Sequence, residues 1–147
     1  MAEQLIVKVL SEPDLALLLN AADDVFDNPV DERHATEFLN DPRHHIVAAI
    51  DNDIIIGFAS AVHYIHPDKT PELWVNEVGV ATSHQNRGIG KAIMKEMLRL
   101  GHELGCNTAW VLTDKENAAA NGLYKSVGGV GSDAVIYEIK ITNMPSP

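Results

Sequence analysis

The stretch HQNRGIGKA, residues 84–92, places two glycines and an arginine directly before an amphipathic run. That run, residues 88–104, carries apolar residues at helical spacing, whereas residues 73–81 ahead of it are typical of a strand. Glycines let a backbone approach a ligand closely, and the first N–H groups of a helix favour an anion. The stretch therefore predicts a strand, a loop and a helix that together bind a phosphate.

Two common nucleotide-binding motifs do not fit this stretch. A dinucleotide fingerprint, G-x-G-x-x-G, requires a third glycine where Ile93 stands. A P-loop requires glycine at Gln85 and serine or threonine at Ala92. The spacing excludes both motifs, and a tight turn without a ligand remains the alternative.

Periodicity divides the rest of the chain into further elements. Residues 11–14, S-E-P-D, resemble a helix start, and apolar residues continue at helical spacing through Ala22 to Phe26. Asp51-Asn52-Asp53 indicates a hairpin. The other helices are predicted at 31–39, 88–104 and 117–126, and the strands at 4–9, 45–50, 54–64, 73–81, 108–113 and 133–141. This order predicts a mixed α/β domain.

Length and composition bound the class of protein. The 147 residues fit one domain, in which 142–147 are expected to form a flexible tail. No secretory pattern and no run of 18 uncharged apolar residues is present, so a cytoplasmic protein without a membrane span is expected. The single cysteine, Cys106, cannot form an internal disulfide and is expected in the core rather than as a nucleophile.

The charge is unevenly distributed along the chain. The formal net charge of −10 argues against nucleic-acid binding, which requires a basic face. Residues 1–80 contain 15 acidic and 4 basic residues, whereas residues 81–147 contain 6 and 7. The acidic half would attract a cationic ligand, and the balanced half tolerates an anion. Solubility alone is the alternative explanation.

Two correctly spaced motifs resemble those of the GNAT superfamily of acetyl-CoA-dependent N-acetyltransferases. Residues 85–90 match Q/R-x-x-G-x-G/A. Residues 117–128 match N-x-x-A-x-x-x-Y-x-x-x-G, although Gly129 replaces the aromatic residue that usually follows. The order of elements agrees from about residue 4 to residue 141. The resemblance implies a GNAT fold, with a mixed, mostly antiparallel central sheet flanked by helices and a splayed strand pair that holds acetyl-CoA.

By this resemblance, the backbone of the glycine loop would bind the pyrophosphate of coenzyme A. Arg87 would add positive charge, and Gly79 has no side chain to obstruct the pantetheine arm. Asn117 would contact the cofactor near its thiol, with a helix N-cap as its alternative role. The residues implied to bind the cofactor are Val78, Gly79, Val80, Gln85, Asn86, Arg87, Gly88, Ile89, Gly90, Lys91 and Asn117.

Glu77 and Tyr124 are the predicted catalytic residues. If alternation holds along the strand, Glu77 shares a face with Leu73 and Val75, where partial desolvation would suit a general base. The Tyr124 phenol, with an ordinary pKa of about 10, would protonate the departing thiolate, as a tyrosine at this motif position commonly does in GNAT enzymes. A carboxylate at the sheet edge and a packed aromatic ring are the respective alternatives.

Within the superfamily, the chain most resembles aminoglycoside 3-N-acetyltransferases. This resemblance rests on residues 25–29, 76–80 and 120–128. It implies that the acceptor is a cationic small-molecule amine, at the 3-amino group of an aminoglycoside. The acidic residues expected to line the acceptor cleft are Asp27, Asp31, Glu37 and Asp133, each of which is otherwise a solvated surface acid.

Other functions remain open from the sequence. The acceptor is alternatively a polyamine or a protein or peptide amine. A sensory module that binds acyl-CoA without catalysis, and a structural interaction domain, are the non-enzymatic alternatives. No metal is expected, because the His44-His45 and His63-x-x-His66 pairs lack a clear third ligand. Many family members are dimers, so the resemblance also implies a homodimer.

Overall fold

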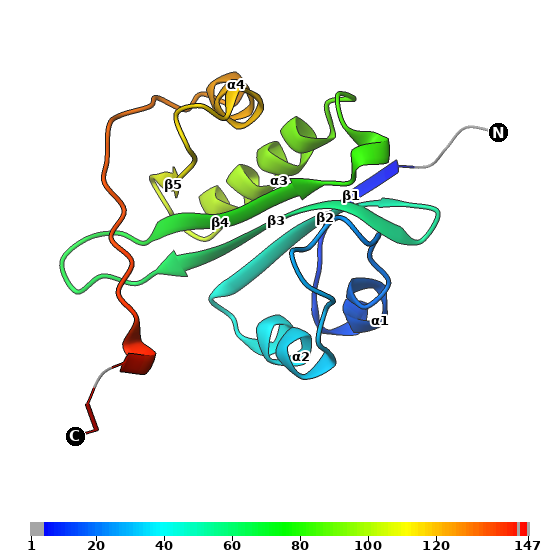
Figure 1. Cartoon of the computed structure of the whole chain (residues 1–147), viewed down its shortest axis with the longest axis horizontal. Coiled ribbons are helices and arrows are strands. Elements are labelled where there is room, and N and C mark those ends of the chain that lie inside the picture. The colour runs from blue at the N-terminus through cyan, green and yellow to red at the C-terminus, as the bar shows by residue number, and fades with distance from the viewer. Residues whose placement is uncertain (1–4, 144, 147) are drawn as a thin grey trace.

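A five-stranded sheet in the order β1-β2-β3-β4-β5 runs through the computed structural model, which describes residues 5–143, 145 and 146 (Figure 1). All neighbouring strands are antiparallel except β4 and β5, which are parallel. The strands are β1 (Leu5–Val9), β2 (His44–Asp51), β3 (Ile54–Tyr64), β4 (Glu72–Val80) and β5 (Ala109–Val111). The predicted mixed, mostly antiparallel sheet is confirmed.

Helices cover both faces of this sheet (Figure 1). The helices α1 (Leu15–Leu18) and α2 (Glu32–Asn40) lie on one face, and α3 (Ile89–Glu103) lies on the other, with α4 (Ala118–Ser126) beside it. Short 3-10 helices span Glu12–Asp14, Thr82–His84 and Ile141–Asn143. No helix among the described residues is long and apolar enough to cross a membrane.

Two local sequence signals act as expected. The Asp14 carboxylate accepts a hydrogen bond from the Ser11 backbone N–H at 2.8 Å, as the predicted capping box requires. Asn52 and Asp53 both have positive φ, 50° and 64°, which is the conformation of a two-residue type I′ turn. The β2–β3 hairpin is therefore confirmed.

The long helix α3 also follows its sequence pattern. Ile93 and Met97 are completely buried against the sheet, and Gly105 ends the helix with a φ of 84°. Gly101 lies in the last turns of α3, where glycine ordinarily weakens a helix. In the structure a Cβ there would lie 3.0 Å from the Leu73 side chain, so glycine is what lets this turn pack closely on β4.

The first predicted helix is much shorter than its apolar spacing indicates. It ends at Leu18, and Ala22 instead donates its backbone N–H to the Ile55 carbonyl at 2.9 Å. Phe26 lies in the following loop and packs against Phe58, with 4.2 Å between the centroids of the tilted rings. The prediction that Ala22 and Phe26 are helical is wrong, because contacts with β3 outweigh local spacing.

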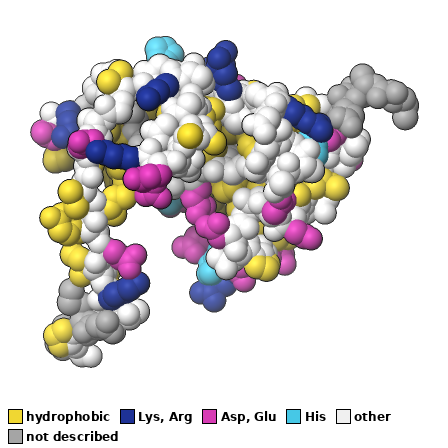
Figure 2. Space-filling view, turned by 45° about the horizontal axis from the view of Figure 1, so that its top comes forward, with side chains coloured by type: hydrophobic (Ala, Val, Ile, Leu, Met, Phe, Trp, Pro, Cys, Tyr) yellow, Lys and Arg dark blue, Asp and Glu magenta, His cyan; other side chains and the backbone are white. Residues whose placement is uncertain are grey.

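The predicted closing strand at 133–141 is also wrong. These residues form no ladder with any described strand. Beyond α4 the chain leaves the body as a segment, residues 130–143, that is extended up to its final 3-10 helix and that we call the C-terminal arm (Figure 1, Figure 2). The alternation of apolar and polar residues shows that a segment suits a strand. It does not determine whether a neighbouring strand is present to pair with that segment. The start of the first predicted strand, Gln4, and residues 144 and 147 of the expected flexible tail lie outside the described residues.

Candidate functional site

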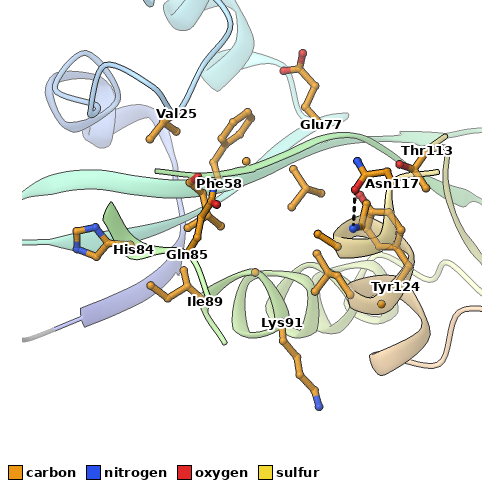
Figure 3. A pocket seen from close by; sticks show the side chains of 18 of the residues that line it. Val25, Phe58, Glu77, His84, Gln85, Ile89, Lys91, Thr113, Asn117 and Tyr124 are labelled. Atoms are coloured by element: carbon orange, nitrogen blue, oxygen red, sulfur yellow. Dashed lines mark hydrogen bonds between the residues drawn. The ribbon is translucent and has the colours of Figure 1, made fainter. Parts of the chain in front are cut away.

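A cleft opens where β4 and β5 diverge. The two strands pair only from Leu73 to Val75 on β4, so the second half of β4 has no neighbour on that side among the described strands. The cleft has a volume of about 850 Å³ and is bounded by this part of β4, the loop before α3, and α4 (Figure 3). The splayed strand pair expected from the sequence is present.

Most residues predicted to bind a cofactor meet in this cleft. Ten of them line it: Val78, Gly79, Val80, Gln85, Asn86, Gly88, Ile89, Gly90, Lys91 and Asn117. Arg87 belongs to the same loop but is not among the lining residues. The Lys91 side chain extends from α3 away from Glu77 and Asn117 (Figure 3).

The loop before α3 has a conformation that only certain residues adopt easily. Asn86 and Gly88 have φ values of 61° and 77°, and Gly88 is the N-cap of α3. A Cβ at Gly88 would meet nothing within 4 Å, so glycine is favoured there by its backbone angle rather than by space. The Gln85 side-chain amide donates to the Val80 carbonyl at 3.1 Å and holds the loop to the end of β4. The N-terminus of α3 thus borders the cleft.

Gly79 is needed for a different reason from the one that the sequence indicated. A Cβ at this position would lie 2.9 Å from the Val25 carbonyl oxygen and 3.3 Å from the Phe58 ring. The glycine therefore lets the loop after α1 pack directly on β4. Its backbone still lines the cleft.

Glu77 does not lie on the strand face that alternation predicts. The β3–β4 register shifts between Ser60 and Ala61, so Val75 pairs with Ala61 but Glu77 pairs with Ser60. Asn76 is the extra residue of this β-bulge, which reverses the alternation. Glu77 consequently points to the side of the sheet that carries α1 and α2, and its side chain is exposed. The predicted face, shared with Leu73 and Val75, is wrong.

A second, smaller cavity lies on that side of the sheet. It has a volume of about 290 Å³ between β3, β4, α2 and the loop before α2. Glu77, Asp27 and Phe58 line both this pocket and the cleft. The Glu77 carboxylate therefore stands where the two cavities meet.

The four acidic residues expected around an acceptor separate into two groups. Asp27 and Asp31 line the smaller pocket, and Asp31 also caps α2 by accepting the His34 backbone N–H at 2.9 Å. Glu37 and Asp133 line neither cavity. Asp133 instead lies on the arm, 2.8 Å from the Lys115 ammonium.

Tyr124 and Asn117 lie together on the other side of β4 from the Glu77 carboxylate (Figure 3). Tyr124 is half-buried, and this burial raises the pKa of its phenol, so the hydroxyl keeps its proton at neutral pH. The Asn117 side chain accepts the Ala120 backbone N–H at 3.0 Å and caps α4. The capping role is therefore real, and Asn117 lines the cleft as well.

Sequence reasoning missed two side chains that hold the loop in place. His84, which lines the cleft, lies 2.8 Å from the Asp51 carboxylate at the end of β2, and both side chains are largely buried. Asp24, also in the cleft wall, accepts the Thr82 backbone N–H at 2.8 Å, which lowers the pKa of its carboxyl. No motif marks Asp24 or Asp51, since each meets the loop from a distant part of the chain.

Of the remaining histidines, only His34 lines one of these two cavities, the smaller pocket, and Cys106 lines neither. His45 Nε2 and His63 Nδ1 are 2.7 Å apart on adjacent strands. Within residues 5–143, no group of three or more His, Cys, Asp or Glu side chains is arranged to hold a metal ion. Burial raises the pKa of the Cys106 thiol.

Comparison with known proteins agrees with this architecture. The model of the acetyltransferase (GNAT) family matches residues 15–128. The chain is 30% identical over 92 residues to N-alpha-acetyltransferase RimI of Mycobacterium tuberculosis, covering 61% of this chain and 54% of that protein. It is 29% identical over 100 residues to streptothricin acetyltransferase of Streptomyces lavendulae, covering 67% and 51%. The chain thus spans about half the length of the curated relatives it matches.

A solved structure extends the likeness to nearly the whole chain. The aminoglycoside N-acetyltransferase AAC(6′)-Iy in complex with CoA superposes with a TM-score of 0.77 at 19% identity, covering 96% of this chain and 97% of that one. At this identity the likeness shows the fold.

Proposed function

The chain belongs to the acetyltransferase (GNAT) family, and on that premise we propose that it transfers an acetyl group from acetyl-CoA to a primary amine of a cationic small molecule. The observation that carries the proposal is the position of Glu77, whose carboxylate stands where the cleft and the smaller acidic pocket meet. A transfer between two substrates requires such a junction, because the attacking and the reacting atoms must come together there.

The cleft fits the cofactor in size and chemistry. Its volume of about 850 Å³ is within the range of cofactor sites. The N-terminus of α3 favours the pyrophosphate, and the free edge of β4 at residues 78–80 suits an amide-rich chain that adds as a strand. Acetyl-CoA, when bound, supplies the acetyl group as a thioester.

Two side chains would move the protons. Glu77 would accept a proton from the acceptor amine at its carboxylate, directly or through a water molecule. On the other side of β4, Tyr124 would donate its phenolic proton to the departing thiolate, and the raised pKa of this phenol keeps the proton available at neutral pH. Their placement on opposite sides of the strand suits an amine that attacks from the smaller pocket.

The acidic lining of the smaller pocket supports a cationic acceptor. Asp27, Asp31 and Glu77 place three carboxylates around about 290 Å³. We propose an aminoglycoside, acetylated at its 3-amino group, as the short sequence matches indicate. The name of the structurally similar AAC(6′)-Iy refers to the 6′-amino group instead. The test should therefore look for acetylation at both the 3-amino and the 6′-amino group. A peptide amine is the second candidate, because RimI is an N-alpha-acetyltransferase.

The deciding experiment is thiol release from acetyl-CoA with aminoglycosides, polyamines and peptides as acceptors. Product NMR then identifies the acetylated nitrogen. We expect turnover with aminoglycosides and only background hydrolysis without an amine. Turnover with peptides alone would contradict the small-molecule acceptor. Acetyl-CoA binding by calorimetry without thiol release for any amine would indicate a sensory module instead.

A further inference from the structure

The Phe58 ring forms part of the boundary between the two cavities. Three of the described residues line both the cleft and the smaller pocket, and Phe58 is the apolar one, since the others are Asp27 and Glu77. The Phe58 ring and the Glu77 carboxylate point to the same side of β4 (Figure 3). The junction at which we place the acetyl transfer therefore has one apolar wall and two carboxylates.

The Phe58 ring has little freedom to move aside. The residue is 3% exposed, and its ring packs against Phe26, with 4.2 Å between the two centroids. Toward β4, the ring carbon Cε1 lies 3.3 Å from the position that a Cβ would take at Gly79. Toward β2, it pairs with Ala48, which is completely buried. In an interior packed this closely, even one additional methylene group matters, so the ring acts as a fixed wall.

This wall limits what the junction can accept. If Glu77 takes the proton of the attacking amine, the acyl end of the cofactor must come to the same junction. A longer acyl chain would need space either beside the two carboxylates or beside the ring. The first direction is unfavourable because the chain would displace water from charged groups, and the second because it would overpack a fixed wall. An acetyl group carries only a methyl group beyond its carbonyl carbon and has the least need for such space.

We propose that Phe58 determines the donor specificity of this protein by limiting the acyl group of the CoA thioester to acetyl. The proposal rests on the acetyl transfer proposed above, and it adds a side chain that neither cofactor motif contains. Phe58 belongs to β3, whereas the motifs lie at residues 85–90 and 117–128. It acts through the space that its ring occupies and exchanges no proton.

The test removes the ring and keeps the position apolar. Phe58→Leu opens space beside Glu77, and Phe38→Leu is the matched control, because Phe38 lines the smaller pocket but not the cleft. Calorimetry without an acceptor gives the dissociation constants of acetyl-CoA, propionyl-CoA and butyryl-CoA. Wild type and control should bind butyryl-CoA more weakly than acetyl-CoA by roughly 10–200-fold, the range for a methylene group in an apolar pocket. Phe58→Leu should lose most of this difference.

Thiol release with one accepted amine measures kcat/KM for the same three thioesters. The preference for acetyl-CoA over butyryl-CoA should fall by at least about tenfold in Phe58→Leu and remain unchanged in Phe38→Leu. If no amine supports thiol release, the proposed function fails, and the dissociation constants still decide the role of Phe58. The two failures are therefore distinguishable.

Phe58→Met is a second variant that disturbs the core less. Methionine fills irregular space in a core, but its flexible side chain can turn aside for a longer acyl chain. Circular dichroism and thermal unfolding show whether each variant is folded. Equal binding of the three thioesters by wild type would overturn the proposal. So would a wild-type preference for acetyl-CoA in folded Phe58→Leu or Phe58→Met, or an equal loss of preference in Phe38→Leu.

Discussion

At the scale of single residues, the carboxylate of Glu77 takes its direction from one extra residue in β4. The bulge at Asn76 turns the side chain from the face of α3 to the face of α1 and α2. There the carboxylate lines the smaller pocket. Regular alternation would have pointed it to the opposite face of the sheet. The proposed base therefore depends on a local irregularity of the backbone.

Replacing Glu77 by glutamine tests this role. Glutamine preserves the shape of the side chain but cannot accept the proton, so kcat should fall by roughly 10²–10⁴, the range of general acid–base catalysis. The matched control is Glu37→Gln, at an exposed position of α2 that lines neither cavity. Steady-state thiol release over a range of pH measures both variants. A Glu77→Gln enzyme with the wild-type pH–rate profile would remove Glu77 from the role of base.

At the scale of elements, β4 is held by its contact with the loop after α1. Gly79→Ala would place a methyl group 2.9 Å from the Val25 carbonyl, where backbone must move to admit it. Overpacking of this kind typically destabilises by about 1–3 kcal/mol. Urea unfolding of the variant should show this loss.

The control for Gly79→Ala is a glycine with free space around it. A Cβ at Gly122 meets nothing within 4 Å, and Gly122 lies inside α4. Alanine there should stabilise the helix by roughly 0.5–1 kcal/mol. Equal stability of the two alanine variants would show that the Val25 contact does not constrain β4.

Elements whose residues signal locally could be predicted from the sequence. The turn at Asn52 and Asp53, the stripe of α3 and the glycine loop each depend on neighbours within a few residues, and the structure has all three. The end of α1 depends on Ile55, far along the chain. Spacing could not reveal it.

The residues of the candidate site could likewise be predicted only where a short motif marks them. Glycine positions and the Asn117 cap follow from short motifs, and they lie in the cleft. The direction of Glu77 depends on a register shift between two strands, and His84 depends on Asp51. Asp133 was grouped with the acceptor residues by charge alone, which does not determine where a side chain lies.

At the scale of the whole molecule, His45 makes stability depend on pH. Burial, together with the nearby His63 and His44, lowers the pKa of His45 from 6.5 to about 4 against the opposing effect of Asp41. Between these values the unfolded chain binds a proton that the native state does not. The free energy of unfolding should therefore fall as the pH is lowered from about 6.5 to about 4.

Removing the imidazole should flatten this dependence. His45→Asn keeps a polar side chain beside His63 but removes the one imidazole whose pKa is lowered to about 4. Urea unfolding across that range should give a shallower pH slope than wild type. His102→Asn, at an exposed position of α3, is the control and should keep the wild-type slope. An unchanged slope in His45→Asn would mean that other groups carry the dependence.

In evolutionary terms, position 129 couples one codon to the direction in which the chain leaves α4. With a Cβ position only 2.7 Å from the Tyr124 carbonyl, every residue other than glycine would force the chain to leave α4 by another route. In family members with an aromatic residue after the motif glycine, the last segment of the chain would thus leave α4 in a different direction. A single inherited substitution here would redirect the last segment of the chain at a position that does not line the cleft between β4 and β5.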